Sequence, residues 1–310
     1  MLKRILLCTT IFVALLTSVS DLEAVEFAQY RDRAILIRYE APLKNAAEAL
    51  AASYPGIRGE VEKKLAWETD FIPLVVLIRS HDLFRRESRN DLVTAFAVPR
   101  ENLIVMDYSR MGKTPFDVNA TFAHELCHLL LHRHIEPDFL PKWLDEGVAQ
   151  WVAGSAAILD VGDRDLLKQA VISGSLLPMG SISSRFPDQP AAFSLAYEES
   201  RSFVEFIVHE YGERKLLAIL EGLHRGKTVA QAVSENLPLG LSALELNWRA
   251  ALLRKFSWQT YLADHVYWIL FFFAAVGTIC GYLRLRRRVR NYRDEEDGDF
   301  PGGEENGEDR

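Results

Sequence analysis

The sequence predicts an α+β protein: a small N-terminal mixed sheet, a helical C-terminal half and one C-terminal transmembrane helix. Three observations support this prediction. Short apolar or alternating runs occupy residues 34–107, helical periodicity dominates from residue 114 onward, and an uncharged apolar run covers residues 266–283. Strands followed by helices are typical of an α+β domain. With 310 residues, 49% of them hydrophobic, the chain can hold one sizeable domain and additional short segments.

Four strands are expected in the N-terminal half. The alternating segment 34–39 and the apolar segment 71–78 each predict one strand. Segments 95–98 and 102–107 predict two more, joined by a turn that begins at Pro99. The sequence has no internal repeats. Because the strands come first and the helices follow, the strands are expected to form a small sheet backed by a helical half.

Two helices can be placed from their caps and breakers. Residues 43–67 predict a helix broken near Pro55-Gly56, because proline removes a helical hydrogen bond. A second helix is expected to begin with Thr114 as its cap, Pro115 in its first turn and Asp117 near its positive end. No residue that breaks helices follows before Pro137, so this helix contains the segment TFAHELCHLLLHRH.

That segment, residues 121–134, concentrates metal-ligating side chains. His124 and His128 are four residues apart, so they project from one face of the helix and can reach one metal ion. Glu125 lies about 100° further round the helix, close enough to face a water molecule on the metal without being a ligand. The resulting H-E-x-x-H pattern predicts two zinc ligands and a carboxylate base.

The pattern does not identify the third ligand. His132 lies about 12 Å along the helix axis from His124, too far to share an ion with both histidines. His134 has the spacing of the third histidine in metzincins, but Leu131 stands where those proteins have the glycine at which the chain turns. Cys127 occupies a variable position of the pattern and is expected to be a small buried hydrophobe.

Two acidic residues on the next predicted helix remain as candidates. Residues 140–154 have an amphipathic pattern, and Glu146 follows His128 at a distance that lets this helix fold back against the first. Gly147 would permit a close approach of the two. A set of two histidines and one glutamate is found in catalytic zinc sites. Asp145 is the alternative, and spacing alone does not separate it from Glu146.

The two blocks together resemble the gluzincin branch of the zincin metallopeptidases, in particular small peptidase-MA-like domains. The segment from His124 to His128, followed by Trp-Leu-Asp-Glu-Gly-Val-Ala-Gln-Trp at 143–151, is similar to the family pattern HExxH…WLxEGxA. The resemblance implies a zincin-like fold in which Glu146 is the third zinc ligand. It also implies that the strand 102–107 lines the cleft and pairs with an extended substrate.

The resemblance covers about residues 34–255. A third matching block consists of Leu195–Val204, Tyr211-Gly212 and Trp248-Arg249. Related families imply that Tyr197 stabilises the oxyanion, with a core tyrosine, His209 or His224 as the alternatives. Gln150 departs from thermolysin-like enzymes, in which an acid at this place orients a zinc-bound histidine.

These residues predict a zinc-dependent peptidase with one zinc ion per chain and a peptide or protein as substrate. Zinc lowers the pKa of a bound water toward ~7. Glu125 is expected to take up the proton and to pass it to the leaving amine. The alternative is a zincin-fold binding module at the membrane surface whose site is unused. Glu125 argues against that alternative, because zinc binding alone does not require it.

Both ends of the chain predict association with a membrane. Residues 1–20 combine Lys3 and Arg4, a short apolar run and small residues, as in a cleavable signal peptide, with an uncleaved anchor as the alternative. Residues 266–283 form a helix of about 27 Å, close to the ~30 Å hydrocarbon core. Arginines follow within 284–293, so the positive-inside rule places the C-terminus in the cytoplasm and the domain at 25–260 outside it. A bacterial inner membrane with a periplasmic domain suits this topology, as does a Gram-positive surface.

Charge and cysteine content narrow the class of partner. The net charge is −7, and the mildly acidic region between the signal peptide and the span argues against nucleic acid. Within residues 284–310 a basic segment precedes an acidic tail that is too poor in apolar residues to fold. Cys127 is the single cysteine between signal peptide and span, so no disulfide is possible within the exported domain. No pattern in the sequence indicates an oligomeric state.

Overall fold

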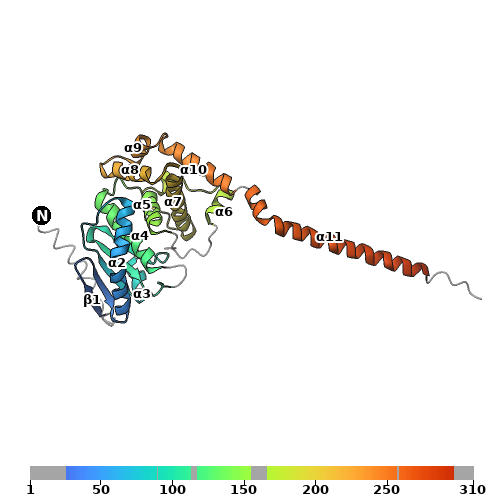
Figure 1. The fold of residues 1–310 in the computed structure, drawn as a ribbon, viewed down its shortest axis with the longest axis horizontal. Helices are drawn as coiled ribbons and strands as arrows, with labels where there is room; N and C mark the ends of the chain where they lie inside the picture. The colour runs from blue at the N-terminus through green and yellow to red at the C-terminus, as the bar shows by residue number, and fades with distance from the viewer. Residues whose placement is uncertain (1–25, 89, 113–116, 155–165, 257, 297–310) are drawn as a thin grey trace, which may run out of the picture. The chain divides into compact units, whose positions relative to one another are not determined.

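The computed structural model describes residues 26–88, 90–112, 117–154, 166–256 and 258–296 (Figure 1). The chain divides into two compact units, Met1–Ala251 and Leu252–Arg310. The expected signal peptide at 1–20 lies outside the described residues.

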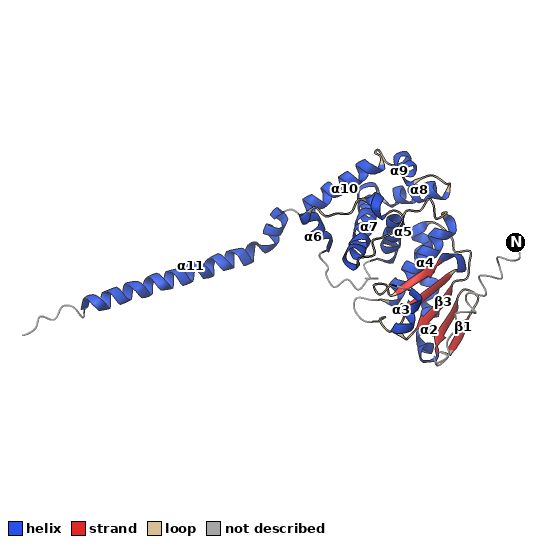
Figure 2. Cartoon of the chain, turned by 180° about the vertical axis from the view of Figure 1, so that it is seen from behind, coloured by secondary structure: helices blue, strands red, loops and turns tan. Residues whose placement is uncertain are grey.

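The first unit begins with one five-stranded mixed sheet (Figure 2). Its strands are β1 (Phe27–Arg31), β2 (Leu36–Glu40), β3 (Leu74–Ile78), β4 (Ala95–Val98) and β5 (Leu103–Asp107). Their order across the sheet is β1-β2-β3-β5-β4, with β2, β3 and β5 parallel and the two outer strands antiparallel to their neighbours. The four expected strands are confirmed. The first strand, β1, was not predicted, because it lies at the edge and none of its residues is buried.

The position of β5 corrects one expectation. This strand, predicted to line a cleft, pairs with β3 on one side and with β4 on the other. All five of its residues are buried. It has therefore no free edge, and the edge strand nearest the helical half is β4, which contacts the histidine-rich helix.

Helices cover both faces of the sheet. On one face, α3 (His81–Ser88) places Phe84 against Ile78, Leu103 and Val105 in a compact apolar cluster. Because side chains alternate along a strand, Ile104 and Met106 of β5 point to the opposite face, toward α4 (Val118–His134).

The helix α2 (Lys44–Leu65) lies against β1 and β2 and also contacts α4. It is continuous, so the expected break near Pro55-Gly56 is wrong. Proline removes one internal hydrogen bond, but seven buried residues spaced along one face hold the helix against the core. They are Ala47, Leu50, Ala51, Tyr54, Ile57, Val61 and Leu65.

The remainder of the first unit is helical, as predicted. The helices are α5 (Lys142–Ala153), α6 (Leu166–Ser173), α7 (Pro190–Tyr211), α8 (Glu213–His224), α9 (Val229–Asn236) and α10 (Leu241–Lys255), with short 3-10 turns at Ala41–Leu43, Pro99–Glu101 and Met179–Ile182. Three buried aromatic rings join α5, α7 and α10: Phe203 lies 5.0 Å from Trp143 and 5.2 Å from Trp248 between ring centroids. This aromatic contact makes α7 the central helix of the second half.

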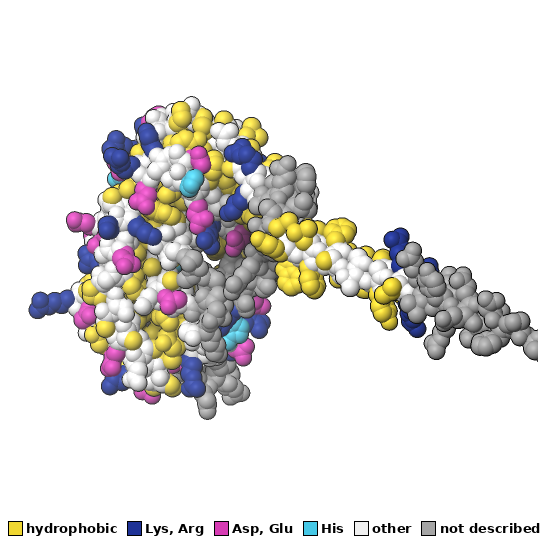
Figure 3. All heavy atoms as spheres, turned by 45° about the vertical axis from the view of Figure 1, so that its right-hand side comes forward, with side chains coloured by type: hydrophobic (Ala, Val, Ile, Leu, Met, Phe, Trp, Pro, Cys, Tyr) yellow, Lys and Arg dark blue, Asp and Glu magenta, His cyan; other side chains and the backbone are white. Residues whose placement is uncertain are grey.

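The second unit consists mainly of α11 (Trp258–Glu296). Its segment His265–Arg287 has a mean hydropathy of 1.9 and is not buried, so by length and composition it can cross a membrane. Figure 3 shows apolar side chains along this segment and basic ones at its C-terminal end. The orientation of such a span and the compartment of the first unit stay predictions.

Candidate metal centre

The helix α4 begins three residues later than expected. Its cap is Asp117, whose extended backbone places the carboxylate to accept a hydrogen bond from the N–H of Ala120 at 2.8 Å. The expectation that Thr114 caps this helix is therefore wrong, and Thr114 and Pro115 lie outside the described residues. The helix runs without a turn through Leu131 and ends at His134.

Most of the helix α4 is buried in the interior of the first unit. Ten consecutive or nearly consecutive residues from Thr121 to Leu131 are buried, including His124, Glu125 and His128, with exposed fractions of 1%, 3% and 7%. Polar side chains buried to this degree are expensive unless they find partners. The three side chains therefore need partners from a neighbouring element.

That element is α5, which starts after Pro141 and ends before Gly154. The close approach permitted by Gly147 is to α7, since a Cβ on this residue would lie 2.4 Å from the carbonyl oxygen of Ser200. The expectation that Gly147 permits an approach to α4 is thus wrong. With Gly147 against α7, the neighbouring Asp145 and Glu146 face α4.

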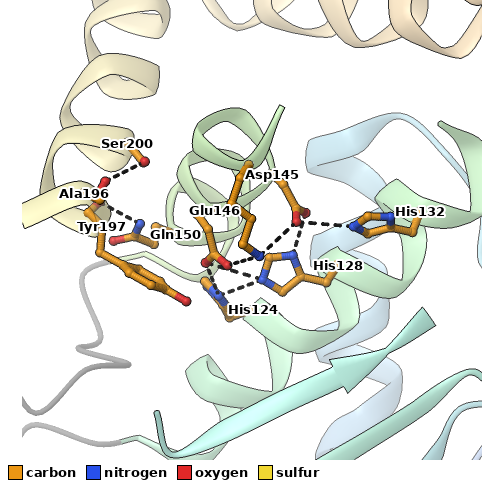
Figure 4. A network of polar contacts seen from close by, with 10 residues as sticks. His124, His128, His132, Asp145, Glu146, Gln150, Ala196, Tyr197 and Ser200 are labelled. Atoms are coloured by element: carbon orange, nitrogen blue, oxygen red, sulfur yellow. Dashed lines mark hydrogen bonds and ion pairs between the residues drawn. The ribbon is translucent and has the colours of Figure 1, made fainter. Parts of the chain in front are cut away.

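Three side chains converge between α4 and α5 (Figure 4). The Nε2 atoms of His124 and His128 are 3.0 Å apart, and Glu146 Oε2 lies 3.4 Å from the first and 3.6 Å from the second. Ligands at 2.0–2.1 Å from a tetrahedral zinc ion are separated from one another by about 3.4 Å. Glu146 Oε2 is buried and has no hydrogen-bond partner among the described residues. The donor set and its spacing fit zinc.

Asp145 has a different task from Glu146. Its Oδ1 accepts a hydrogen bond from Nδ1 of His128 at 2.6 Å, and its Oδ2 lies 3.3 Å from Nε2 of His132. A carboxylate that holds Nδ1 fixes the ring so that Nε2 points at the metal position. The two acidic residues that spacing could not separate are therefore separated by geometry, and His132 is a partner of Asp145.

Gln150 stands where thermolysin-like enzymes have an acid that orients a zinc-bound histidine, and its hydrogen bond differs from that role. Gln150 donates from Nε2 to the backbone carbonyl of Tyr197 at 3.0 Å. The Tyr197 ring is buried against Phe186 and Phe193, and Figure 4 shows its hydroxyl directed toward Glu146 and His124. Burial, together with the Glu146 and Glu125 carboxylates, raises the pKa of Tyr197 well above its usual value. Tyr197 is thus a neutral O–H donor beside the site.

The remaining candidates lie elsewhere. His134 stacks on Trp67 with ring centroids 4.6 Å apart, and its carbonyl accepts a hydrogen bond from His224, so the metzincin-like alternative is wrong. His209 is exposed and pairs with Glu210. Cys127 is buried, and burial raises the pKa of its thiol well above the usual value, which disfavours the thiolate that binds metals.

Lys142 was missed by sequence reasoning. It is the first residue of α5, and its Nζ lies 2.6 Å from Oε1 of Glu146 and 3.5 Å from Oδ2 of Asp145. Burial opposes ionisation of Glu146, but the charges of Lys142 and His128 outweigh it and hold the pKa well below its usual range. The four-residue spacing between Lys142 and Glu146 could have indicated this contact, since such side chains are neighbours on a helix.

Glu125 has the opposite electrostatic environment. Burial raises the pKa of its carboxyl from 4.5 to about 7, and the negative charges of Glu146 and Asp145 add to the effect, while His128 and Lys142 oppose it. A carboxyl with a pKa near neutrality can both accept and return a proton at physiological pH. This environment suits a general base.

A cavity of about 590 Å³ adjoins the site. One wall comes from β4 and the turn that follows it, and the other from the ends of α4 and α5 that face each other. Its lining includes Ala97, Asn102, His128, Lys142 and Asp145. Of the three candidate ligands only His128 is in this lining, so the cavity lies along the edge strand on the Asp145 side of the His128 ring.

One family of known proteins matches this chain. A family model described as the Peptidase MA superfamily matches residues 97–254. A search of curated proteins found no match.

Three solved structures are similar at low identity. An M1 zinc metallopeptidase from Deinococcus radiodurans is 13% identical with a TM-score of 0.42, over 74% of this chain and 51% of that one. A two-domain M1 zinc metallopeptidase bound to L-arginine is 14% identical with a TM-score of 0.45, over 73% of this chain and 51% of that one. For Legionella pneumophila aminopeptidase A in complex with aspartic acid the identity is 14%, the TM-score 0.43 and the coverage 72% and 27%. This chain thus matches about half the length of the first two structures and less of the third.

The family match covers just over half of the chain and contains all the residues that converge between α4 and α5, so this chain belongs to the Peptidase MA superfamily.

Proposed function

We propose that this chain is a zinc-dependent peptidase of the gluzincin type, with residues 25–260 as the peptidase domain. The observation that carries the proposal is the convergence of two imidazole nitrogens and one carboxylate oxygen at the spacing of zinc ligands. Membership of the Peptidase MA superfamily supports the reaction class.

Within this proposal His124, His128 and Glu146 hold one zinc ion. When bound, zinc supplies an activated water and polarises the carbonyl of the peptide bond. Three protein ligands leave one position of a tetrahedral ion free for that chemistry. Asp145 keeps the His128 ring in the orientation that binding requires.

Glu125 is the general base. Its carboxylate takes the proton from the attacking water and then transfers it to the nitrogen of the leaving amine. Because the pKa of Glu125 is about 7, the proton is held neither too weakly to be taken up nor too strongly to be returned.

Tyr197 is the candidate for stabilising the oxyanion. Its hydroxyl stays protonated because its pKa is raised, and the packing of its ring on Phe186 and Phe193 restricts the orientation of the side chain. A donor that is already oriented stabilises negative charge on the substrate oxygen without reorganisation.

The substrate is a peptide or a protein, and α11 is the membrane anchor. The apolar segment His265–Arg287 and the arginines that follow it support a single span with a cytoplasmic C-terminus. In this topology the peptidase domain is extracytoplasmic, as in a bacterial inner-membrane protein with a periplasmic domain.

Glu125→Gln tests the proposal. In the full-length protein purified in detergent, hydrolysis of a quenched-fluorescence peptide library should be abolished by a zinc chelator and restored by added zinc. Glu125→Gln should keep its zinc and lose about 10²–10⁴-fold in kcat/KM, because it removes the base but no ligand. Glu60→Gln, an exposed residue of α2, is the matched control and should be unaffected.

If the wild type retains one zinc ion but hydrolyses no peptide, the binding-module alternative replaces the peptidase. If the wild type is active and Glu125→Gln is equally active, Glu125 is not the general base. If neither protein retains zinc, the metal assignment itself is wrong.

A further inference from the structure

Lys142 turns its ammonium group back toward the candidate ligands. Its side chain keeps 38% exposure, yet Nζ lies 2.6 Å from the buried Oε1 of Glu146. A lysine at the surface ordinarily lays its stem along the protein and extends its charge into water. The contact with a buried carboxylate therefore has to be explained by what it does for Glu146.

This contact gives the two carboxylate oxygens of Glu146 different surroundings. Oε1 is bound by Lys142, whereas Oε2 faces the Nε2 atoms of His124 and His128 and has no hydrogen-bond partner among the described residues. One oxygen is thus held by an organic cation, and the other is presented to the position that fits a metal ion.

Local helix energetics do not favour this arrangement. A positive charge in the first turn of α5 faces the positive end of the helix, and lysine four residues before glutamate is the weaker order of such pairs. The pair Lys44 and Glu48 occupies the equivalent place at the start of α2, where it is exposed and 3.8 Å apart. The short contact of Lys142 with Glu146 is therefore specific to the metal centre.

The backbone of Lys142 is also fixed. Its N–H donates to the carbonyl of Ser183 at 2.6 Å, which attaches the start of α5 to the 3-10 turn at Met179–Ile182. Its Nζ also lies 3.5 Å from Oδ2 of Asp145. A lysine that is held both at its backbone N–H and at its ammonium group can hold a carboxylate in one orientation.

We propose that Lys142 is a positioning residue that restricts Glu146 to one ligand oxygen and so keeps a coordination position of the bound zinc free. This inference rests on the proposed function of the site. Carboxylates bind metal ions through one oxygen or through both. If both oxygens of Glu146 bound, the second would fill the position that a catalytic zinc keeps open for water and substrate.

A purely structural role for Lys142 makes a different prediction. If the lysine only balanced the charge of two buried acids, its removal would lower stability and leave the coordination of the metal unchanged. The number of ligands around the ion is therefore the deciding readout. Cobalt(II) reports it, since a four-coordinate cobalt ion absorbs visible light more strongly than a five-coordinate one.

The experiment replaces zinc by cobalt in full-length protein in detergent. It compares the wild type with Lys142→Met, which removes the charge, and Lys142→Arg, which keeps it. Lys44→Met is the matched control, and Lys142→Gln replaces the methionine variant if that variant does not fold. Glu146→Ala is included because its loss of cobalt tests the proposed function separately.

Lys142→Met should still bind one cobalt ion but lose the strong four-coordinate absorption, and with zinc its kcat should fall about 10–100-fold with little change in KM. Lys142→Arg and Lys44→Met should resemble the wild type. The inference is overturned if Lys142→Met has the wild-type spectrum and kcat while Glu146→Ala has lost the metal. If Glu146→Ala keeps its cobalt, the proposed function fails instead.

Discussion

The helix α5 has two sides that differ in chemistry. Toward α4 it presents Asp145 and Glu146, which meet imidazoles in a buried polar contact. Toward α7 it presents Trp143, which packs on Phe203, and Gly147, which lies against the backbone of Ser200. One helix thus carries the polar contact of the metal centre and the apolar contact of the core.

The difference separates stability from function. Burial of a large apolar side chain contributes about 1.5–3 kcal/mol, whereas burial of polar and charged groups is unfavourable unless they are paired. The contact between α5 and α7 therefore stabilises the fold, and it offsets the cost of keeping two histidines and three carboxylates out of water between α4 and α5. Changes on the side that faces α7 should lower stability, and changes on the side that faces α4 should alter metal binding and rate.

Gly147→Ala should give the largest loss of stability. An added Cβ would lie 2.4 Å from the carbonyl oxygen of Ser200 and 2.6 Å from Val204, so the two helices must move apart. Overpacking of this kind costs about 1–3 kcal/mol or more. Thermal unfolding of the full-length protein measures the effect. In the control Gly59→Ala the new methyl has open space within α2, so stability should be unchanged or higher. Equal behaviour of the two variants would contradict the close contact of α5 with α7.

Asp145→Asn tests the polar contact of α5 with α4. The amide can still accept the hydrogen bond from His128, but the negative charge that supports the ring is lost. Zinc affinity, measured by competition with a chelating dye, should fall about 10–100-fold with little change in unfolding temperature. Asp70→Asn is the control, because Asp70 also pairs with a residue of α4, the exposed Arg133, yet lies away from the centre. An effect of similar size in both variants would argue against a specific role for Asp145.

Two buried glutamates, Glu146 and Glu199, differ in the direction in which their pKa is shifted. Glu146 has Lys142 beside it and a pKa well below the usual range. Glu199, on α7, is fully buried, and burial raises its pKa to about 8, although the N–H of Leu177 and the charge of Arg249 oppose the shift. The ammonium group of Lys142, 2.6 Å from Glu146, therefore helps to keep that carboxyl ionised at neutral pH, whereas the charge of Arg249 does not overcome the effect of burial on Glu199.

Glu199→Gln should change how stability depends on pH. The folded pKa of about 8 lies above the unfolded value of 4.5, so the protonated carboxyl stabilises the fold below pH 4.5 and that contribution is lost as the pH rises through 8. Glutamine mimics the protonated form. Relative to the wild type, the variant should be more stable at pH 8.5 than at pH 5 by roughly 4 kcal/mol, since the wild type loses about 1.4 kcal/mol for each pH unit between the two pKa values. Denaturant unfolding of the chelator-treated protein at both pH values checks this, and a constant difference between the two proteins would be evidence for an ionised Glu199.

The sequence identified much of this architecture because local patterns determine it. The spacing of His124 and His128 on a helix requires no knowledge of the fold, and alternating segments located four of the five strands. The errors arose where long-range contacts decide the outcome. Pro55 stays inside α2 because one face of that helix is buried, and β5 lies inside the sheet because β4 pairs with its outer side.

The second helix of the site was harder to predict than the first. Whether Asp145 or Glu146 points at the histidines depends on the rotation of α5, which its contact with α7 at Gly147 fixes. Asp145 supports His128 through a contact between two helices that no sequence pattern marks, whereas the contact of Lys142 with Glu146 had only its four-residue spacing as a signal. Resemblance to a family supplied Glu146, and the structure supplied the reason for it.

The metal content of the purified full-length protein tests the account most directly. Elemental analysis after dialysis should find about one zinc per chain in the wild type and in His134→Ala, and none in Glu146→Ala, because Glu146 completes the ligand set and His134 stacks on Trp67. Zinc retained in full by Glu146→Ala, or lost from His134→Ala, would contradict a centre built from α4 and α5.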